Sequence, residues 1–203
     1  MTEHPIIFSG PMVRAILEGR KTMTRRVIKP QPTLTRNCGF EWKGEVYGQG
    51  SDDVGTNRNF CRWACPYDQQ DARLWVRETF QTLEDFAIKG ACYYRADGET
   101  VTALIEGSEY DLSHKWHPSI FMPRRASRIL LEVTAVRVER LWDISEDDAK
   151  AEGAPWEDCW MSYRQSFESL WGFLNANRGY GWDANPWVWV IEFRRIQTEA
   201  LHD

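Results

Sequence analysis

Alternating hydrophobic and polar positions predict strands at several places along the chain. Residues 129–141 carry the clearest signal, because apolar and polar side chains alternate there and β-branched residues are frequent. Residues 73–79 and 187–193 show the same kind of pattern. The apolar run at 6–8 predicts a first strand, and the β-branched residues of 22–28, followed by prolines, predict a second. A fold with a substantial sheet is therefore expected.

Apolar residues at helical spacing predict helices between these strands. The first covers about 11–19 and ends at Gly19, a residue suited to the left-handed position after a helix. The second begins after Ser145, whose hydroxyl can cap it and whose following acids suit the positive end of a helix. The third covers 162–175, with large apolar residues along one face. Together with the strands, these helices predict an α+β fold.

Two long segments, 31–70 and 81–122, show no sustained hydrophobic period. We interpret them as insertions, the first with room for a hairpin and the second with a strand at Tyr93 and Tyr94. A chain of 203 residues and 23.8 kDa is long enough for one domain with a full core. The sequence therefore predicts a single domain, 1–203, that carries both insertions.

The composition excludes several classes of protein. Hydrophobic residues at 42%, charged residues at 27% and a mean hydropathy of -0.55 are typical of a folded chain rather than a disordered one. No run approaches the roughly 18 apolar residues of a membrane span, and the first ten residues lack the features of a secretory signal. Five unevenly spaced cysteines form no disulfide framework. We expect a cytoplasmic protein without a membrane partner.

The net charge of -5 is unevenly distributed along the chain. Residues 14–36 hold seven basic residues against one acid, whereas residues 143–158 hold seven acids against one lysine. A local basic stripe can bind phosphate even on an acidic protein. The two segments can equally face one another or solvent, and composition leaves both interpretations open.

Searches for metal and cofactor motifs give one candidate zinc site and no phosphate loop. The candidate ligands lie inside the two insertions: Cys38, Cys61, Cys65, His114 and His117. The spacing between Cys61 and Cys65 is one residue longer than in the commonest zinc knuckle, and buried free thiols are the simpler interpretation. We therefore expect neither a metal nor a cofactor.

Eleven tryptophans are many for a chain of this length. Four of them are predicted in loops, Trp42, Trp63, Trp116 and Trp182. There an indole ring can stack on a nucleobase, or pack against the protein as most tryptophans do. The sequence does not decide between these two uses.

The segment 16–26 concentrates a lysine, two threonines and three arginines immediately after the first predicted helix. Its Gly-x-Lys-x-x-x-x-Arg pattern, on Gly19, Lys21 and Arg26, resembles the signature of the ASCH domain family. Residues 71–76, with Gln70 where the family has glycine, and also 131–134, 141–153 and 189–193, are similar to other segments of that family. The whole chain resembles the larger ASCH proteins of bacteriophages and prophages, although the matched segments cover under half of it.

The resemblance implies a PUA-like mixed β-barrel with flanking helices and a nucleoside or nucleic acid, RNA rather than DNA, as partner. One bacterial branch of the family hydrolyses N4-acetylcytidine with a lysine, a threonine and a glutamate. Its motif matches Lys21 and Thr24, and aligning its acidic helix puts the glutamate on Glu152. The implied function is an amidohydrolase acting on an N4-acylated cytidine.

In that hydrolase, Thr24 would be the nucleophile, Lys21 its base and Glu152 the proton donor to the leaving amine. Strand alternation would put Lys21 and Thr24 on opposite faces, so an irregular turn after Gly19 is required. Further substrate contacts are expected from Arg20, Arg25, Arg26, Trp75, Arg77 and Glu78. Residues 124–128 are expected to add their arginines to one positive face.

Two other functions stay open at this point. A PUA-like fold can bind RNA or modified DNA without any chemistry, since fold does not fix function. A ribonuclease is the third possibility, with Lys21 and the arginines stabilising the transition state at phosphorus and Thr24 dispensable.

Overall fold

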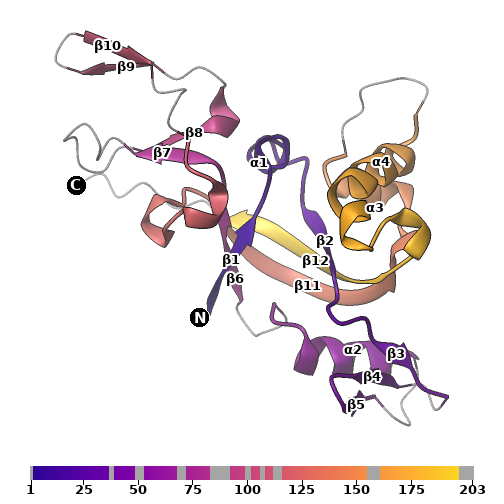
Figure 1. Cartoon of the computed structure of the whole chain (residues 1–203). Helices are drawn as coiled ribbons and strands as arrows, with labels where there is room; N and C mark the ends of the chain where they lie inside the picture. The colour runs from indigo at the N-terminus through magenta and orange to yellow at the C-terminus, as the bar shows by residue number, and fades with distance from the viewer. Residues whose placement is uncertain are drawn as a thin grey trace. The chain divides into compact units, whose positions relative to one another are not determined.

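A computed structural model gives the fold of the chain (Figure 1). It describes residues 2–36, 39–48, 53–67, 72–82, 92–98, 102–105, 108–111, 116–154 and 161–196. The chain divides into two compact units built from interleaved segments. The first unit consists of Met1–Thr2, Arg20–Ala72 and Val133–Arg194, and the second of Glu3–Gly19, Arg73–Glu132 and Arg195–Asp203. The expectation of a single domain stays a prediction, and each unit is described by itself below.

The main sheet contains the five strands that hydrophobic alternation predicts. They are β1 (Glu3–Ile7), β2 (Met23–Val27), β6 (Arg73–Arg77), β11 (Leu130–Arg140) and β12 (Trp187–Ile196). In the second unit, β1 runs parallel to β6, and the first residues of β11 pair antiparallel to β6. In the first unit, β12 pairs antiparallel to β2. This mixed sheet together with the helices confirms the α+β class.

Closure of the sheet into a barrel is the part of the predicted fold that is wrong. Hydrogen bonding orders the strands as β1-β6-β11-β12-β2, which leaves β1 and β2 as edges within the described chain. Strand β2 is short. The residue before it, Thr22, is already engaged, since its amide donates to the Ala151 carbonyl at 2.9 Å. The described sheet is therefore open.

The predicted helices are confirmed near their expected bounds. In the second unit, α1 (Gly10–Leu17) has proline in its first turn and is followed by Gly19 at a φ of 74°. In the first unit, Ser145 caps α3 (Glu146–Ala151) and Ser162 caps α4 (Tyr163–Asn175). The described residues also form short 3-10 helices along the chain: η2 (Arg95–Asp97), η4 (Ser119–Phe121), η5 (Arg124–Ala126), η6 (Leu141–Asp143), η7 (Ala176–Arg178) and η8 (Trp182–Ala184).

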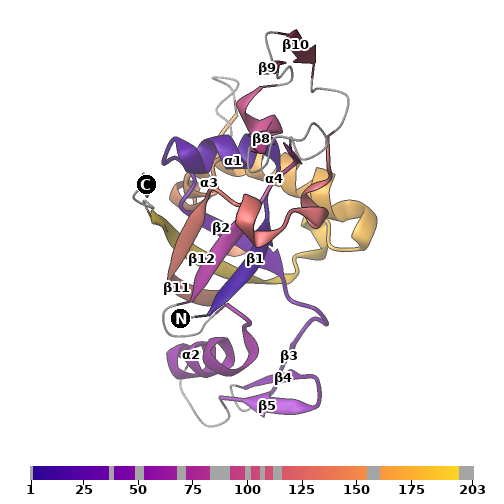
Figure 2. The ribbon, with the colours of Figure 1, turned by 90° about the vertical axis from the view of Figure 1, so that its left-hand side faces the viewer.

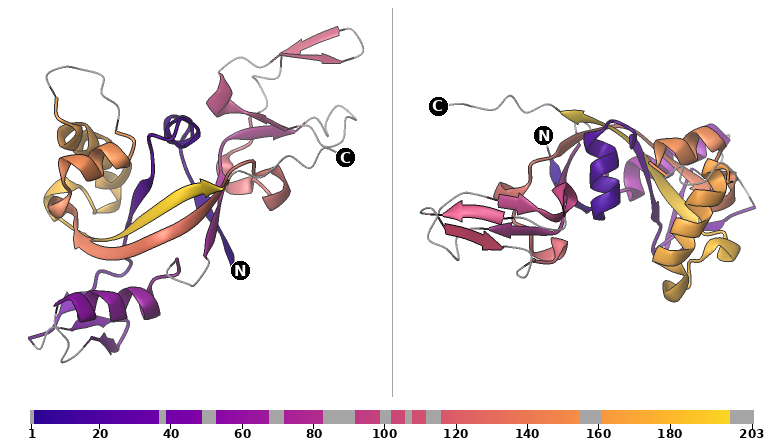
Figure 3. Two further views of the ribbon diagram at one scale, coloured as in Figure 1. Left: turned by 180° about the vertical axis from the view of Figure 1, so that it is seen from behind. Right: turned by 90° about the horizontal axis from the view of Figure 1, so that it is seen from above.

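Helices α3 and α4 cover one face of the sheet in the first unit (Figures 1 and 3). The core between them shares apolar residues from β2, β12 and both helices: Met23, Leu141, Ile144, Ala149, Ala154, Phe167, Trp171, Val188 and Val190. Burial of these side chains supplies the main hydrophobic stabilisation of this layer. None of the described helices is long and apolar enough to cross a membrane.

The first insertion forms a three-stranded meander and a helix that the sequence did not predict. The strands β3 (Thr33–Leu34), β4 (Phe40–Trp42) and β5 (Glu45–Tyr47) pair antiparallel, and α2 (Asp53–Ala64) follows (Figure 2). Phe60 anchors α2, with its ring 4.6 Å from that of Phe40 and 5.0 Å from that of Trp189. Because α2 buries few apolar side chains besides Phe60 and Cys61, its sequence shows no helical stripe.

Close contact in this insertion depends on one glycine. Gly48 has a φ of 75°, and a Cβ at this position would lie 2.6 Å from the Cα of Thr56 in α2. A larger residue would therefore force the meander away from the helix.

The second insertion contains β7 (Phe80–Thr82), β8 (Cys92–Tyr94), β9 (Thr102–Ile105) and β10 (Ser108–Asp111). Strand β7 pairs antiparallel with β8, and β9 with β10. Phe80, Met122 and Ala126 form a small separate core against one face of β7 and β8. The predicted strand at Tyr93 and Tyr94 is thus confirmed as β8.

Candidate ion-pair site

Buried charged side chains gather on the face of β2 that packs against α3. Met23 and Arg25 both point to this face, since the Arg25 guanidinium lies 3.4 Å from the Met23 sulfur and contacts acids of α3. Lys21, just before the strand, reaches Glu152 at the end of the same helix. The first unit therefore collects its buried cations beside the short acidic helix.

Lys21 and Glu152 form the innermost pair of this site. The Lys21 Nζ donates to Glu152 Oε2 at 2.7 Å and to the Glu152 carbonyl oxygen at 2.6 Å. Their side chains are 0% and 4% exposed. Glu152 ends α3 and Gly153 follows in the left-handed conformation, so the ammonium also lies at the negative end of a helix.

The protonation of Lys21 is altered by this environment. Burial lowers the pKa of the Lys21 ammonium, while the charge and hydrogen bond of Glu152 oppose that shift. Arg25 and Arg26 lower the pKa of Lys21 further through like-charge repulsion. The pKa of Lys21 therefore lies closer to neutral pH than that of an exposed lysine.

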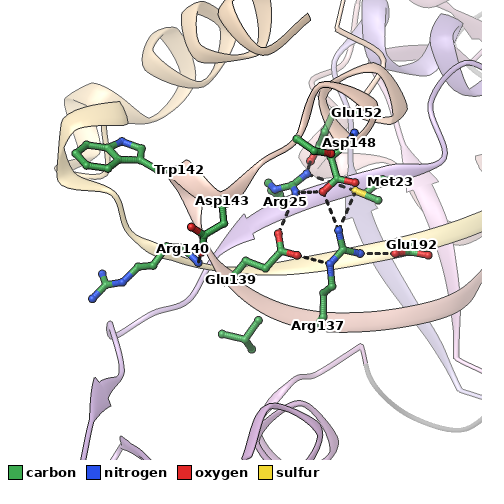
Figure 4. Close-up of polar contacts among 12 residues, drawn as sticks. Met23, Arg25, Arg137, Glu139, Arg140, Trp142, Asp143, Asp148, Glu152 and Glu192 are labelled. Carbon is green, nitrogen blue, oxygen red and sulfur yellow. Dashed lines mark hydrogen bonds and ion pairs between the residues drawn. The ribbon is translucent and has the colours of Figure 1, made fainter. Parts of the chain in front are cut away.

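Arg25 connects three carboxylates, as Figure 4 shows. Its guanidinium lies 2.5 Å from Asp148, 3.0 Å from Glu139 and 3.5 Å from Glu152, and the Arg25 side chain is 0% exposed. Arg25 was predicted to contact substrate. Arg25 is engaged by three acids, and its role as a substrate contact stays a prediction.

A second arginine completes the network from β11. Arg137 donates to Asp148 at 2.8 Å and also pairs with Glu139 and Glu192. The sequence analysis did not select any of these residues. A signal was available, because residues two apart on a strand share a face, which sets Arg137 beside Glu139. Hydrophobic periodicity does not reveal which helix such charges meet.

Thr24 lies on the opposite face of β2 from the ion pairs. It stands between Met23 and Arg25, both of which point toward α3, so strand alternation turns Thr24 to the other side. Its register partner on β12 is Ile191, and the Arg26 partner is Trp189, whose ring packs on α2. The structure thus brings Lys21 and Glu152 together and leaves Thr24 apart from them.

Arg20 and Arg26 are the other predicted contacts from this segment. Arg20 is exposed at the start of the first unit. Arg26 follows Thr24 toward the α2 face of the sheet, and burial lowers the pKa of its guanidinium. The charge of Glu152 acts on Arg26, since it raises the pKa of the guanidinium against the effect of burial.

Trp75, Arg77 and Glu78 belong to the second unit, where they form separate arrangements. Trp75 is buried in β6, and the Arg77 guanidinium lies 4.7 Å from its ring centroid. Glu78 accepts two hydrogen bonds of 3.0 Å from Arg128, which also donates two of 2.8 Å to Asp97. The bidentate geometry makes Arg128 the centre of a carboxylate–arginine–carboxylate bridge.

Tyr94 packs under this bridge. Its ring centroid lies 3.9 Å from the Arg128 guanidinium, and its hydroxyl donates to the Ala126 carbonyl at 2.9 Å. Burial raises the pKa of Tyr94 to about 12. Tyr94 is therefore a neutral support for the arginine at neutral pH.

Replacing Glu78 with glutamine is expected to flatten the pH dependence of stability. Burial raises the pKa of the Glu78 carboxyl above its ordinary 4.5, against the opposing effect of Arg128. The folded protein then keeps a proton that the unfolded chain has lost, so the free energy of unfolding falls as pH rises from 4.5 through the raised pKa. Urea unfolding of both proteins across this range measures the slope. Asp97→Asn, which alters the exposed arm of the same bridge, should keep it, and equal slopes for wild type and Glu78→Gln would refute the assignment.

The predicted positive face is largely neutralised by ion pairs. Arg124 lies 2.6 Å from Glu3, and Arg128 and Arg25 are held by the acids already described. The sequence shows where these arginines stand in the chain. It does not show which carboxylates lie against them in the folded protein. These ion pairs offset the charges of Arg25, Arg124 and Arg128, and the single positive face stays a prediction.

The candidate zinc ligands do not come together in the described residues. Cys61 and Cys65 are buried one helical turn apart at the end of α2, and the Cys61 sulfur lies 3.5 Å from Asn57 Oδ1. His117 belongs to the second unit, and residues 38 and 114 lie outside the described residues. No group of three or more histidine, cysteine, aspartate or glutamate side chains suited to a metal ion occurs in the described part of the chain.

Comparisons with known proteins give one structural likeness. No family model matches the chain, and no curated protein matches it. A crystal structure of an ASCH domain from Lactobacillus crispatus JV V101 aligns with a TM-score of 0.42 and 9% identity, covering 96% of this chain and 79% of that one. A likeness at this level leaves function to be inferred from the residues themselves.

Proposed function

We propose that the protein is a hydrolase of the amide bond in an N4-acylated cytidine, with Lys21 and Glu152 as its proton-transfer pair. The observation that carries the proposal is the 2.7 Å contact between Lys21 Nζ and Glu152 Oε2 in a buried setting. Support for the substrate class comes from the sequence motif, whose lysine and glutamate types are the two groups in contact. A base and an acid within one hydrogen bond are what amide hydrolysis requires.

The reaction adds water across the carbon–nitrogen bond and yields a carboxylic acid and cytidine. When the shared proton resides on Glu152, Lys21 is a neutral amine that can take a proton from the nucleophile as its oxygen bonds to the carbonyl carbon. Glu152 then gives its proton to N4 as the carbon–nitrogen bond breaks, because an unprotonated amine is a poor leaving group. The pair ends with the number of protons it began with.

A water molecule is the nucleophile that suits this arrangement. Thr24 was predicted for that role. We propose water instead, because strand alternation turns Thr24 away from Met23 and Arg25, which face the ion pairs. Burial of the pair favours the neutral amine and also requires the substrate to displace a neighbouring side chain to reach it. The proposed machinery is therefore a dyad with water rather than a threonine triad.

Incubation with N4-acetylcytidine, followed by chromatography of cytidine and acetate, tests this function. Wild-type protein should release both products in equal amounts. Lys21→Met and Glu152→Gln should lower kcat by about a hundredfold or more, the usual contribution of a general acid or base. Thr24→Val, which keeps the shape and removes the hydroxyl, should leave kcat within a few-fold of wild type.

Lys29→Met is the matched control, because Lys29 is an exposed lysine of the same segment whose ammonium lies over the Tyr180 ring. It should retain full activity, and thermal unfolding should show that each variant is folded. Loss of activity in Thr24→Val alone would restore the threonine as nucleophile. No turnover by wild type on any acylcytidine tried would end the proposal in favour of a binding module.

A further inference from the structure

The Gln81 side chain is fully buried and makes no hydrogen bond to any described residue. Its exposure is 0%, and neither the Nε2 nor the Oε1 atom has a partner in the described chain. A buried amide without partners costs free energy, because water satisfied both atoms in the unfolded chain. Such a group is retained in a protein most readily where something else binds it.

The surroundings of Gln81 are set by the register of β7. Gln81 pairs with Tyr93 of β8 on one side. On the other side, Phe80 and His117 exchange backbone hydrogen bonds of 3.2 and 2.8 Å in an antiparallel bridge. The bridge is isolated, and Trp116 precedes His117 in the chain, so the same antiparallel register continued by one residue would set Trp116 opposite Gln81. The amide therefore stands in the row Tyr93, Gln81, Trp116.

This row lies on the face of β7 turned away from the small core. Phe80 packs with Met122 and Ala126, and its ring centroid lies 5.4 Å from that of His117, so these residues occupy the other face. Tyr93 and Trp116 are both half-buried, which leaves part of each aromatic side chain open to solvent. On this face of β7, a buried amide therefore lies between two partly exposed aromatic residues.

The chemistry of the row selects a planar heteroaromatic ligand. A glutamine amide offers one donor and one acceptor side by side, which matches an adjacent acceptor and donor on the edge of a nucleobase. Aromatic side chains stack on the face of such a ring. A peptide backbone also matches the amide but has no ring for Tyr93 and Trp116 to contact.

We infer that Gln81, Tyr93 and Trp116 form a nucleobase-binding site in the second unit. The amide reads the edge of the base, and the two aromatic side chains hold its faces. The base is carried either by a free nucleoside or by a single-stranded nucleic acid, since both present the same edge. This site belongs to the second unit, whereas the Lys21–Glu152 pair belongs to the first.

Fluorescence anisotropy with short labelled RNA homopolymers, and competition by the corresponding free nucleosides, measures binding by the full chain. Gln81→Met should weaken that binding by about ten- to a hundredfold, as loss of a bidentate base contact does. Trp116→Ala should weaken all probes to a similar extent. Ultraviolet cross-linking followed by mass spectrometry should place the base on the peptides that hold Tyr93 or Trp116.

The free energy of unfolding gives a second, opposite-signed test. Gln81→Met removes an amide without partners and should raise the melting temperature of the free protein. Gln31→Met is the matched control, because the Gln31 amide donates to Ile28 at 2.7 Å and accepts from the Trp187 amide at 2.6 Å. That variant should lower the melting temperature and leave binding unchanged.

Three results would overturn the inference. The first is unchanged binding of every probe by Gln81→Met. The second is a cross-link that maps only outside the second unit. The third is a lower melting temperature for Gln81→Met, which would make the amide a satisfied part of the fold. Competition by free nucleosides at concentrations similar to those of the polymers identifies the nucleoside as the source of the base, and its absence identifies the polymer.

Discussion

Replacing Glu152 with alanine is expected to lower the free energy of unfolding by about 3–5 kcal/mol. The change leaves the Lys21 ammonium without its carboxylate in a position where its side chain is 0% exposed. The ammonium still donates to the carbonyl oxygen of residue 152, which carries no compensating charge. A buried cation without a counter-ion is among the costliest single defects in a folded protein. Urea unfolding monitored by tryptophan fluorescence measures the loss.

A double variant separates the energy of the Lys21–Glu152 ion pair from that of the surrounding structure. Lys21→Met combined with Glu152→Leu removes both charges and keeps similar volume, so it should recover much of the stability lost in Glu152→Ala. A Glu152→Ala protein within about 1 kcal/mol of wild type would show that water reaches the ammonium and screens it. The double variant should have no hydrolase activity under the proposed function.

Replacing Arg25 with methionine is expected to be about as damaging. The substitution leaves Asp148, Glu139 and Glu152 close together without the cation that joins them, and Arg137 contacts only the first two. Loss of a buried cation from such a group costs about 3–5 kcal/mol. Urea unfolding of the Arg25→Met protein measures the loss.

Arg124→Met serves as the control for Arg25→Met. Arg124 makes a similar bidentate contact to Glu3, but the two side chains are 43% and 34% exposed. A pair at the surface contributes about 0–1 kcal/mol, so this variant should remain close to wild type. Equal losses in both variants would refute the view that burial makes Arg25 important.

The ion-pair network shows which residues selected from the sequence lie together and which meet partners that the sequence did not indicate. Lys21 and Glu152 were chosen through a motif, and they do meet. Arg25 was chosen from the same motif as a substrate contact, yet it is consumed by acids from β11 and α3. Charges 114 or more residues apart in the chain meet here, and no local pattern encodes such a pairing.

The helix α2 shows a related limit of pattern reading. Its anchoring contacts are made by Phe60 alone with rings of the meander and of β12. Asn57 of the same helix accepts from the Val138 amide at 3.1 Å and donates to its carbonyl at 2.7 Å, which satisfies backbone groups of β11. Each of these contacts needs a single residue, so they produce no hydrophobic periodicity in the sequence of α2.

The sequence by itself determined the local elements of this protein. Alternation at 129–141, the cap at Ser145 and the glycine at 19 act through neighbours in the chain, so their outcome can be read from the order of residues. Only the tertiary structure decided what the charges do. It paired Lys21 with Glu152, turned Thr24 to the other face and left Gln81 buried without a partner. The physical reason is that the energy of a buried charge or amide depends on the groups within a few ångströms of it. Those groups can lie far away along the chain.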